Sequence, residues 1–119
     1  MDIAAIGRQH LADVLAGGMF HCDVDEWKDG EGKPVRIYWK PVTGVEQQEI
    51  DAASTEVGRT CMTVKVRALN ADGSRIFKDV ALEGMLNDYD YATIRAIAFV
   101  ITGNIGQGAD EELEETVKE

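Results

Sequence analysis

Apolar positions recur every three or four residues along the first segment of the chain. With one histidine among them, they are Ile3, Ile6, His10, Leu11, Val14 and Leu15. This spacing predicts an amphipathic helix over residues 3–15, and Gly17-Gly18 is a typical helix stop. A short helix with one apolar stripe cannot bury that stripe by itself. We therefore expect it to dock on the rest of the domain or on another chain.

Alternating polarity then predicts a β-hairpin. In residues 34–39, Val35, Ile37 and Trp39 alternate with more polar positions, and residues 19–24 form the expected partner strand. The segment between them, residues 28–33, has the lysine, aspartate and glycine composition of a turn. A two-stranded hairpin is marginal alone in water, so a helix should pack on one of its faces.

A capped helix follows the hairpin. Thr43-Gly44-Val45-Glu46 matches the capping box, in which a threonine side chain accepts from the third helical amide and a glutamate reaches back. We expect this helix from Gly44 to about Ser54. Its inward positions should be Val45, Ile50, Ala53 and, beyond that range, Val57.

Residues 62–68 carry two periods at once. Met62, Val64, Val66 and Ala68 alternate with polar residues, which favours a strand and would make the following Asp72-Gly73 a hairpin turn. However, Val57, Cys61, Val64 and Ala68 also line one face of a helix. The residues alone leave both interpretations open.

Two more helices are predicted, a short one over residues 79–86 and a longer one over residues 90–101, capped by Asp88 or Asp90 and stopped by Gly103. The longer helix is apolar almost all round, which is typical of the centre of a core. One face has Tyr91, Ile94, Ala98 and Ile101, and Ile97, Phe99 and Val100 widen it. The glycine-rich residues 103–108 then form a linker to an acidic end.

The predicted fold class is α+β: a mainly α-helical single domain over residues 1–108, with a small β-hairpin in its N-terminal half. Residues 109–119 are expected to form a flexible acidic tail, and the N-terminal helix is a candidate oligomerisation arm. A chain of 119 residues is long enough for one domain with a modest core.

The charge balance narrows the choice of partners. The net charge is -10, and about half of the excess comes from the last eleven residues, where six acids face one lysine. The remaining bases are scattered along the chain. Such a surface repels nucleic acid and anionic membranes, so we expect neither as a partner.

The expected location is the cytoplasm. The longest apolar run, residues 96–102, is too short to span a bilayer, and the amphipathic start after Asp2 does not resemble a secretion signal. Cys22 and Cys61 are expected to be free thiols, as in a reducing compartment, although a disulfide is formally open to two cysteines.

Candidate chemical sites all fail on composition. A calcium loop around Asp72-Gly73 would place Ala68 at its first ligand position, where the loop needs a side-chain oxygen and alanine has only a methyl group. Residues 103–108 lack the lysine and hydroxyl residue that end a phosphate loop. His21 and Cys22 are neighbours on a strand and point to opposite faces, so they cannot simply share a metal ion. We expect no catalytic, cofactor or metal site and no enzymatic activity.

The order of four motifs resembles the tail assembly chaperones of long-tailed bacteriophages. The first three are Asp25-Glu26-Trp27, the aromatic strand Val35-Arg36-Ile37-Tyr38-Trp39, and the helix start Val42-Thr43-Gly44-Val45-Glu46. The fourth runs from Asn70-Ala71-Asp72-Gly73 through Ser74-Arg75-Ile76-Phe77. A short helix, a longer helix and an acidic end complete the pattern. The resemblance covers about two-thirds of the chain, and order and spacing carry it.

Two features depart from the family pattern. The loop between the strands is longer and more charged than the compact Trp-Gly-Gly turn of the family. Residues 62–68 are helical in the family but have a strand-like period here. We expect a helix there, because Cys61, Val64 and Ala68 still align and a single strand would lack a partner.

The resemblance implies a non-catalytic role in the cytoplasm of a bacterial host. Proteins of this family bind the tape measure protein, a long helical polypeptide, and keep it soluble while the major tail protein polymerises around it; they also form oligomers. Often a longer product arises by ribosomal frameshifting. Because aromatic residues dominate contact energy, Trp27, Tyr38 and Trp39 are the expected partner-binding residues. The alternative is that these aromatics seal the core. Strand alternation predicts that either Tyr38 or Trp39 faces outward, and we favour the core for Trp39, whereas Trp27 is open to both interpretations.

Two other functions compete with the chaperone hypothesis. One is a small structural subunit of a phage tail or connector, which would persist in finished particles. The other is an acidic regulatory protein that binds a basic partner, in which case high salt would disrupt the complex.

Overall fold

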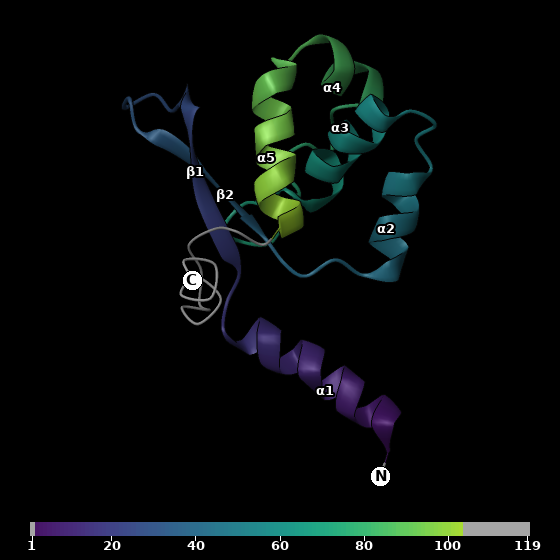
Figure 1. Cartoon of the computed structure of the whole chain (residues 1–119). Helices are drawn as coiled ribbons and strands as arrows, with labels where there is room; N and C mark the ends of the chain where they lie inside the picture. The colour runs from purple at the N-terminus through teal and green to yellow at the C-terminus, as the bar shows by residue number, and fades with distance from the viewer. Residues whose placement is uncertain (1, 104–119) are drawn as a thin grey trace, which may run out of the picture.

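The computed structural model describes residues 2–103, and the predicted tail at 109–119 and linker residues 104–108 lie outside this range. The described part is mainly helical with one antiparallel hairpin, which confirms the predicted α+β fold class (Figure 1). In chain order its elements are α1 (Ile3–Ala16), β1 (Phe20–Lys28), β2 (Pro34–Trp39), α2 (Gly44–Asp51), α3 (Glu56–Arg67), α4 (Leu82–Asn87) and α5 (Tyr91–Gly103).

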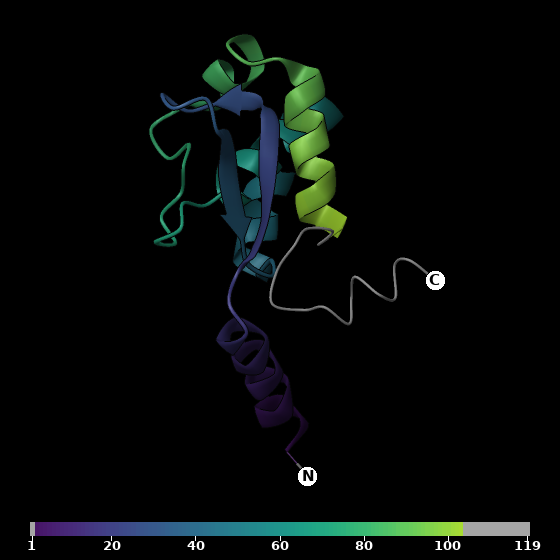
Figure 2. The same cartoon turned by 90° about the vertical axis from the view of Figure 1, so that its left-hand side faces the viewer.

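Helix α1 extends away from the body of the domain, and its N-terminus is the most distant point (Figures 1 and 2). The Asp2 carboxylate caps it by accepting from the amide of Ala5 at 3.1 Å. At the other end, Gly18 has a φ of 92°, a conformation that favours glycine and turns the chain out of the helix. The predicted helix and its glycine stop are both present.

The hairpin has a buried inner face and a polar outer face. On the inner face Phe20 lies opposite Trp39 and Cys22 opposite Ile37. The hairpin packs with this face against the helices, and α5 runs alongside β1 (Figure 2). Strand β1 is longer than predicted, because pairing resumes at Lys28 after an irregularity that follows Val24.

The capping box at the start of α2 is confirmed. Thr43 Oγ1 accepts from the Glu46 amide at 3.3 Å, and Glu46 Oε1 accepts from the Thr43 amide at 3.0 Å. The predicted inward positions are only half right. Ile50 and Ala53 are buried, whereas Val45 is 69% exposed and Val57 is 45% exposed. Val57 does not belong to the predicted helix, because α2 ends at Asp51 and a separate helix, α3, begins at Glu56.

The ambiguous segment is helical: α3 continues to Arg67. Its side chains meet three neighbours, because α3 packs against α2, α4 and α5. Cys61, Val64 and Ala68 are each 0% exposed, as the helical period predicts. Strand-like pairing begins only at Leu69, which exchanges two backbone hydrogen bonds with Tyr38 at 2.8 and 2.9 Å.

Helix α5 is amphipathic, and the prediction that it is surrounded by core is wrong. Ile94, Ile97 and Ile101 are buried, but Phe99 is 69% exposed on the opposite side. The core lies between α5, α3 and the inner face of the hairpin. Its largest side chains that are under 2% exposed are Trp39, Ile37, Met85, Ile94, Ile101, Val64, Val66 and Cys61. Within residues 2–103, no helix is long and apolar enough to cross a membrane.

Candidate partner-binding surfaces

The three predicted partner-binding aromatics do not form one surface. Trp27 follows the irregularity in β1 and is half-buried beside Phe77 and Tyr89, with ring centroids 6.1 Å from each. Phe77 and Tyr89 meet edge to face at 5.6 Å. This cluster closes the end of the core near α4, and Trp27 presents only part of its ring to solvent.

Tyr38 and Trp39 lie on opposite faces of β2, as strand alternation predicts. Trp39 faces the core, is 0% exposed and stacks on Phe20 at a centroid distance of 6.0 Å. A partner has no access to its ring in this structure. Tyr38 is half-buried on the outer face next to His21, with ring centroids 5.8 Å apart.

The outer face of the hairpin is polar around Tyr38. Arg36 Nε donates to the Asp23 carboxylate at 2.8 Å, and this hydrogen bond lowers the pKa of Asp23 below its usual value. Both side chains are about half exposed, so the pair contributes little to stability. Tyr38 is therefore a single aromatic residue in a charged setting, which suits a peripheral contact better than a central anchor.

A larger apolar surface lies on α1. This helix has no buried residue. Its stripe is exposed at Ile3 (74%), Ile6 (55%), Leu11 (39%) and Leu15 (41%). Only Leu11 and Leu15 approach the body of the domain, across a hollow of about 100 Å³ lined on the other side by Pro41 and Leu69. Within residues 2–103, the α1 stripe is thus an apolar surface that is largely uncovered.

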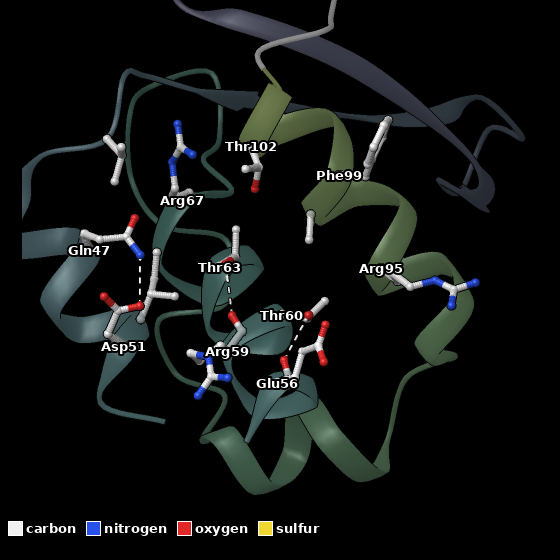
Figure 3. Close-up of a pocket in the computed structure, with 13 residues that line it drawn as sticks. Gln47, Asp51, Glu56, Arg59, Thr60, Thr63, Arg67, Arg95, Phe99 and Thr102 are labelled. Atoms are coloured by element: carbon white, nitrogen blue, oxygen red, sulfur yellow. Dashed lines mark hydrogen bonds between the residues drawn. The ribbon is translucent and has the colours of Figure 1, made fainter. Parts of the chain in front are cut away.

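A second candidate surface is a groove of about 490 Å³ between α2, α3 and α5, which we call the arginine groove. Phe99 and Arg95 border it from α5, Gln47 and Asp51 from α2, and α3 forms its floor (Figure 3). The full lining consists of Val42, Gln47, Ile50, Asp51, Glu56, Arg59, Thr60, Thr63, Arg67, Arg95, Ala98, Phe99 and Thr102.

Arg67 is the most unusual residue of the arginine groove. Its side chain is 6% exposed, and Nη2 donates to the Lys40 carbonyl at 2.9 Å. Its Nε is buried without a hydrogen-bond partner. Burial lowers the pKa of this guanidinium, and the nearby Glu46 carboxylate opposes that change. Arginine remains protonated even so, so a buried positive charge lies at the edge of the groove, beside the Lys40 carbonyl.

The described residues contain no group of three or more histidine, cysteine, aspartate or glutamate side chains placed to hold a metal ion. Around the supposed calcium loop, Asp72 Oδ1 accepts from the Ser74 amide at 2.9 Å and from its hydroxyl at 2.6 Å. Gly73 has a φ of 89° in this turn. The aspartate is therefore engaged in local turn hydrogen bonds, which lower its pKa.

The two cysteines are free thiols in the structure. Cys61 is buried and Cys22 is half-buried on the inner face of β1. Burial, with a smaller contribution from the Asp23 charge, raises the pKa of Cys22 to about 11.

We predict that Cys22 reacts slowly with iodoacetamide in the folded protein. The thiolate is the reactive form, and a thiol with a pKa near 11 is only about 0.1% ionised at pH 8. Alkylation at pH 8, followed by mass spectrometry, should be roughly 200-fold slower than in urea, where the pKa returns to about 8.5. The native rate should rise with pH up to about 11. Equal rates in the native and unfolded protein would contradict the environment described for Cys22.

Sequence reasoning missed the arginine groove. Two signals were present: Phe99 lies off the stripe formed by Ile94, Ile97 and Ile101, and Arg67 ends an apolar helical face. Neither signal shows that α2 and α5 flank α3 so that their side chains border one groove. That arrangement depends on contacts between residues distant in sequence.

Comparison with known proteins does not extend these observations. No protein-family model matches the chain, and neither a curated protein nor a solved structure matches it.

Proposed function

We propose that this chain is a tail assembly chaperone of a long-tailed bacteriophage: a non-catalytic protein that binds the tape measure protein reversibly and keeps it soluble in the host cytoplasm. The uncovered apolar stripe of α1 is the single observation that carries the proposal. The order of sequence motifs from Asp25-Glu26-Trp27 onward supports the family, and the major tail protein is a further expected partner.

The α1 stripe suits an apolar helical partner. Four large aliphatic side chains lie along one side of a 14-residue helix, exposed by 39% to 74%. Fully burying one such side chain contributes about 1.5–3 kcal/mol. Covering the stripe would therefore stabilise a complex by several kcal/mol, offset by the entropy lost on association. This balance gives binding that is specific but reversible.

The net charge supports the same role. A tape measure polypeptide exposes apolar surface that aggregates in water, and a partner with a net charge of -10 keeps the complex dispersed by repulsion. In the absence of the tape measure protein, the stripe is expected to pair with a second copy of the chain, which makes the free protein a homo-oligomer.

We predict that the double substitution Ile6→Ser with Leu11→Ser abolishes chaperone activity. The substitution removes the two central apolar side chains of the α1 stripe and preserves the charge. Co-expression with the long helical polypeptide of a phage tail, a tape measure protein, should then leave that polypeptide in the pellet, whereas the wild-type chain keeps most of it soluble. Light scattering should show a decrease in the oligomeric mass of the free protein.

The matched control is Ala4→Ser with Ala12→Ser, because both alanines are exposed on the same helix. It introduces the same residues at a helix-propensity cost at least as large without removing the stripe, and should behave as wild type. Both variants should melt within a few degrees of wild type, since α1 contributes no buried residue.

Equal precipitation of the long polypeptide with and without this chain would refute the chaperone function. Mass spectrometry of purified virions provides a second test. A chaperone is absent from finished particles, and several copies per particle would instead identify a structural subunit of the tail or connector.

A further inference from the structure

Two loops of the chain, residues 29–33 and 70–74, are built on the same five-residue turn. In each loop the amide of the first residue donates to the carbonyl of the fifth at 2.8 Å, and the amide of the fourth donates to the carbonyl of the first at 3.0 Å. The fourth residue is a glycine with positive φ in both loops, 79° at Gly32 and 89° at Gly73. The two backbones can therefore be compared position by position.

Each turn contains an Asp-Gly pair, but the pairs occupy different positions. Asp29-Gly30 fills the first and second positions, whereas Asp72-Gly73 fills the third and fourth. The fourth amide closes the turn, so the Gly73 amide is bound to a carbonyl. The Gly30 amide makes no hydrogen bond within residues 2–103, and both Asp29 and Gly30 are exposed.

The state of the glycine amide matters because Asp-Gly is a reactive pair. The amide nitrogen after an aspartate can attack the side-chain carboxyl carbon of that aspartate and close a five-membered succinimide ring. Glycine favours this reaction because it has no side chain to obstruct the approach. A hydrogen bond from the same amide to a carbonyl must break before the attack, so it slows ring closure. The turn therefore leaves Asp29-Gly30 open to reaction and restrains Asp72-Gly73.

The two carboxyl groups are held in similar ways, so the amides make the main difference. Asp29 Oδ1 accepts from the amides of Glu31 and Lys33 at 2.8 and 3.0 Å. Asp72 Oδ1 accepts from the amide and the hydroxyl of Ser74 at 2.9 and 2.6 Å. Such donors stabilise the negative charge that develops on this oxygen when a nitrogen adds to the carboxyl carbon. The Ser74 hydrogen bonds also lower the pKa of Asp72, which reduces the protonated form that can lose water.

We propose that Asp29-Gly30 is a self-modification site, at which the folded chain converts aspartate to isoaspartate, and that Asp72-Gly73 is protected. The Gly30 nitrogen bonds to Cγ of the protonated Asp29 side chain, and the amide proton leaves with the carboxyl hydroxyl as water. Water then adds to the former backbone carbonyl carbon of Asp29 and breaks its bond to the Gly30 nitrogen. The main chain afterwards runs through Cγ, and the former backbone carbonyl is a free carboxylate. One water is lost and one is gained, so no other reactant is needed.

The position of this turn makes the product compatible with the fold. Residues 29–33 are all exposed, and they lie at the end of the hairpin opposite to α1 (Figure 1). The extra main-chain methylene should therefore disturb the turn and leave the core in place. The inference does not depend on the proposed function, because α1 is separate from this turn.

The test follows both Asp-Gly pairs in the same full-length protein, incubated for several weeks at 37 °C and pH 6. Trypsin then releases residues 29–36 and 68–75, which contain one pair each. Liquid chromatography with mass spectrometry separates isoaspartyl from aspartyl peptides of equal mass. We expect isoaspartate to form about tenfold faster at position 29 than at position 72, because a turn hydrogen bond must break at the second site.

Incubation in urea is the control for the turn. Both pairs lose their turns when the chain unfolds, so the two rates should become similar. Equal rates in the folded protein, or a faster reaction at position 72, would overturn the proposal. An increase of about tenfold or more at position 29 on unfolding would also overturn it, because the folded turn would then protect Asp29.

An enzymatic readout identifies the product independently. Purified protein isoaspartyl methyltransferase transfers the methyl group of S-adenosylmethionine to the carboxylate that isoaspartate exposes, and releases S-adenosylhomocysteine. After incubation of the folded protein, the methyl label should be found in residues 29–36 and be close to background in residues 68–75. A label divided equally between the two peptides would contradict the assignment.

The variant Gly30→Ala tests the reacting amide. An added Cβ meets no atom within 4 Å at Gly30, where φ is not positive, so the fold should tolerate alanine. The methyl group obstructs attack by the nitrogen, and isoaspartate at position 29 should form about tenfold more slowly. The matched control is Gly7→Ala on α1, which also has room for a Cβ and should leave the rate unchanged. A wild-type rate in Gly30→Ala would refute attack by this amide.

Discussion

Replacing Trp39 with alanine should lower the free energy of unfolding by about 4 kcal/mol. Replacement of a buried phenylalanine or tryptophan by alanine typically costs about 3–5 kcal/mol. Trp39 is 0% exposed, stacks on Phe20 and belongs to the cluster that joins the hairpin to α3 and α5. A domain of this size has a total stability of about 5–15 kcal/mol. Urea denaturation should therefore show a large decrease in the midpoint.

Tyr38→Ala is the matched control for this prediction. It deletes the aromatic ring at the adjacent position of β2, where the side chain is half-buried on the polar face. We expect a decrease of about 1 kcal/mol, typical for a partly exposed site. If the two substitutions destabilise the domain equally, the assignment of Trp39 to the core and Tyr38 to the outer face would be wrong.

Replacing Lys65 with methionine should lower the free energy of unfolding by about 3 kcal/mol. The Lys65 ammonium reaches from α3 to the segment before α4, where it donates to the carbonyls of Phe77, Lys78 and Val80. Hydrogen bonds to a charged group each contribute about 1.5–3 kcal/mol, and an acceptor left buried and unpaired adds a penalty. Their contributions overlap because one ammonium makes all three bonds, so we expect less than their sum.

Lys78→Met is the control, because Lys78 is a neighbouring exposed lysine whose side chain makes no hydrogen bond with the described residues. It should change the stability by less than about 0.5 kcal/mol. Thermal denaturation followed by circular dichroism measures both variants. An unchanged melting temperature for Lys65→Met would show that water satisfies these three carbonyls as well as the ammonium does.

Local chemistry accounts for the features that were predicted correctly. These features depend on residues within a few positions of one another. They are the turns at Gly17-Gly18 and Asp72-Gly73, the Thr43–Glu46 capping box and the alternation in β2. Side-chain hydrogen bonds to nearby amides and the steric limits of the backbone determine such features without reference to the rest of the fold.

The inward faces were predicted less well. Val45 and Phe99 are large and apolar, yet each is 69% exposed. Hydrophobicity predicts how many residues a helix buries, but the face that is buried depends on which neighbours the helix meets. The same limit explains why the sequence left Trp39 open between the core and a partner-binding surface, although alternation favoured the core.

The uncovered stripe of α1 was predictable from its period and its glycine stop. The arginine groove was not, since Arg59, Arg67 and Arg95 gain meaning only when α2, α3 and α5 assemble around one space. Sequence by itself determined the elements, their caps and the acidity of the chain, because these follow from neighbouring residues and from composition. Only the tertiary structure decided which side chains are covered and which charges are brought together, because burial is a property of contacts between distant segments.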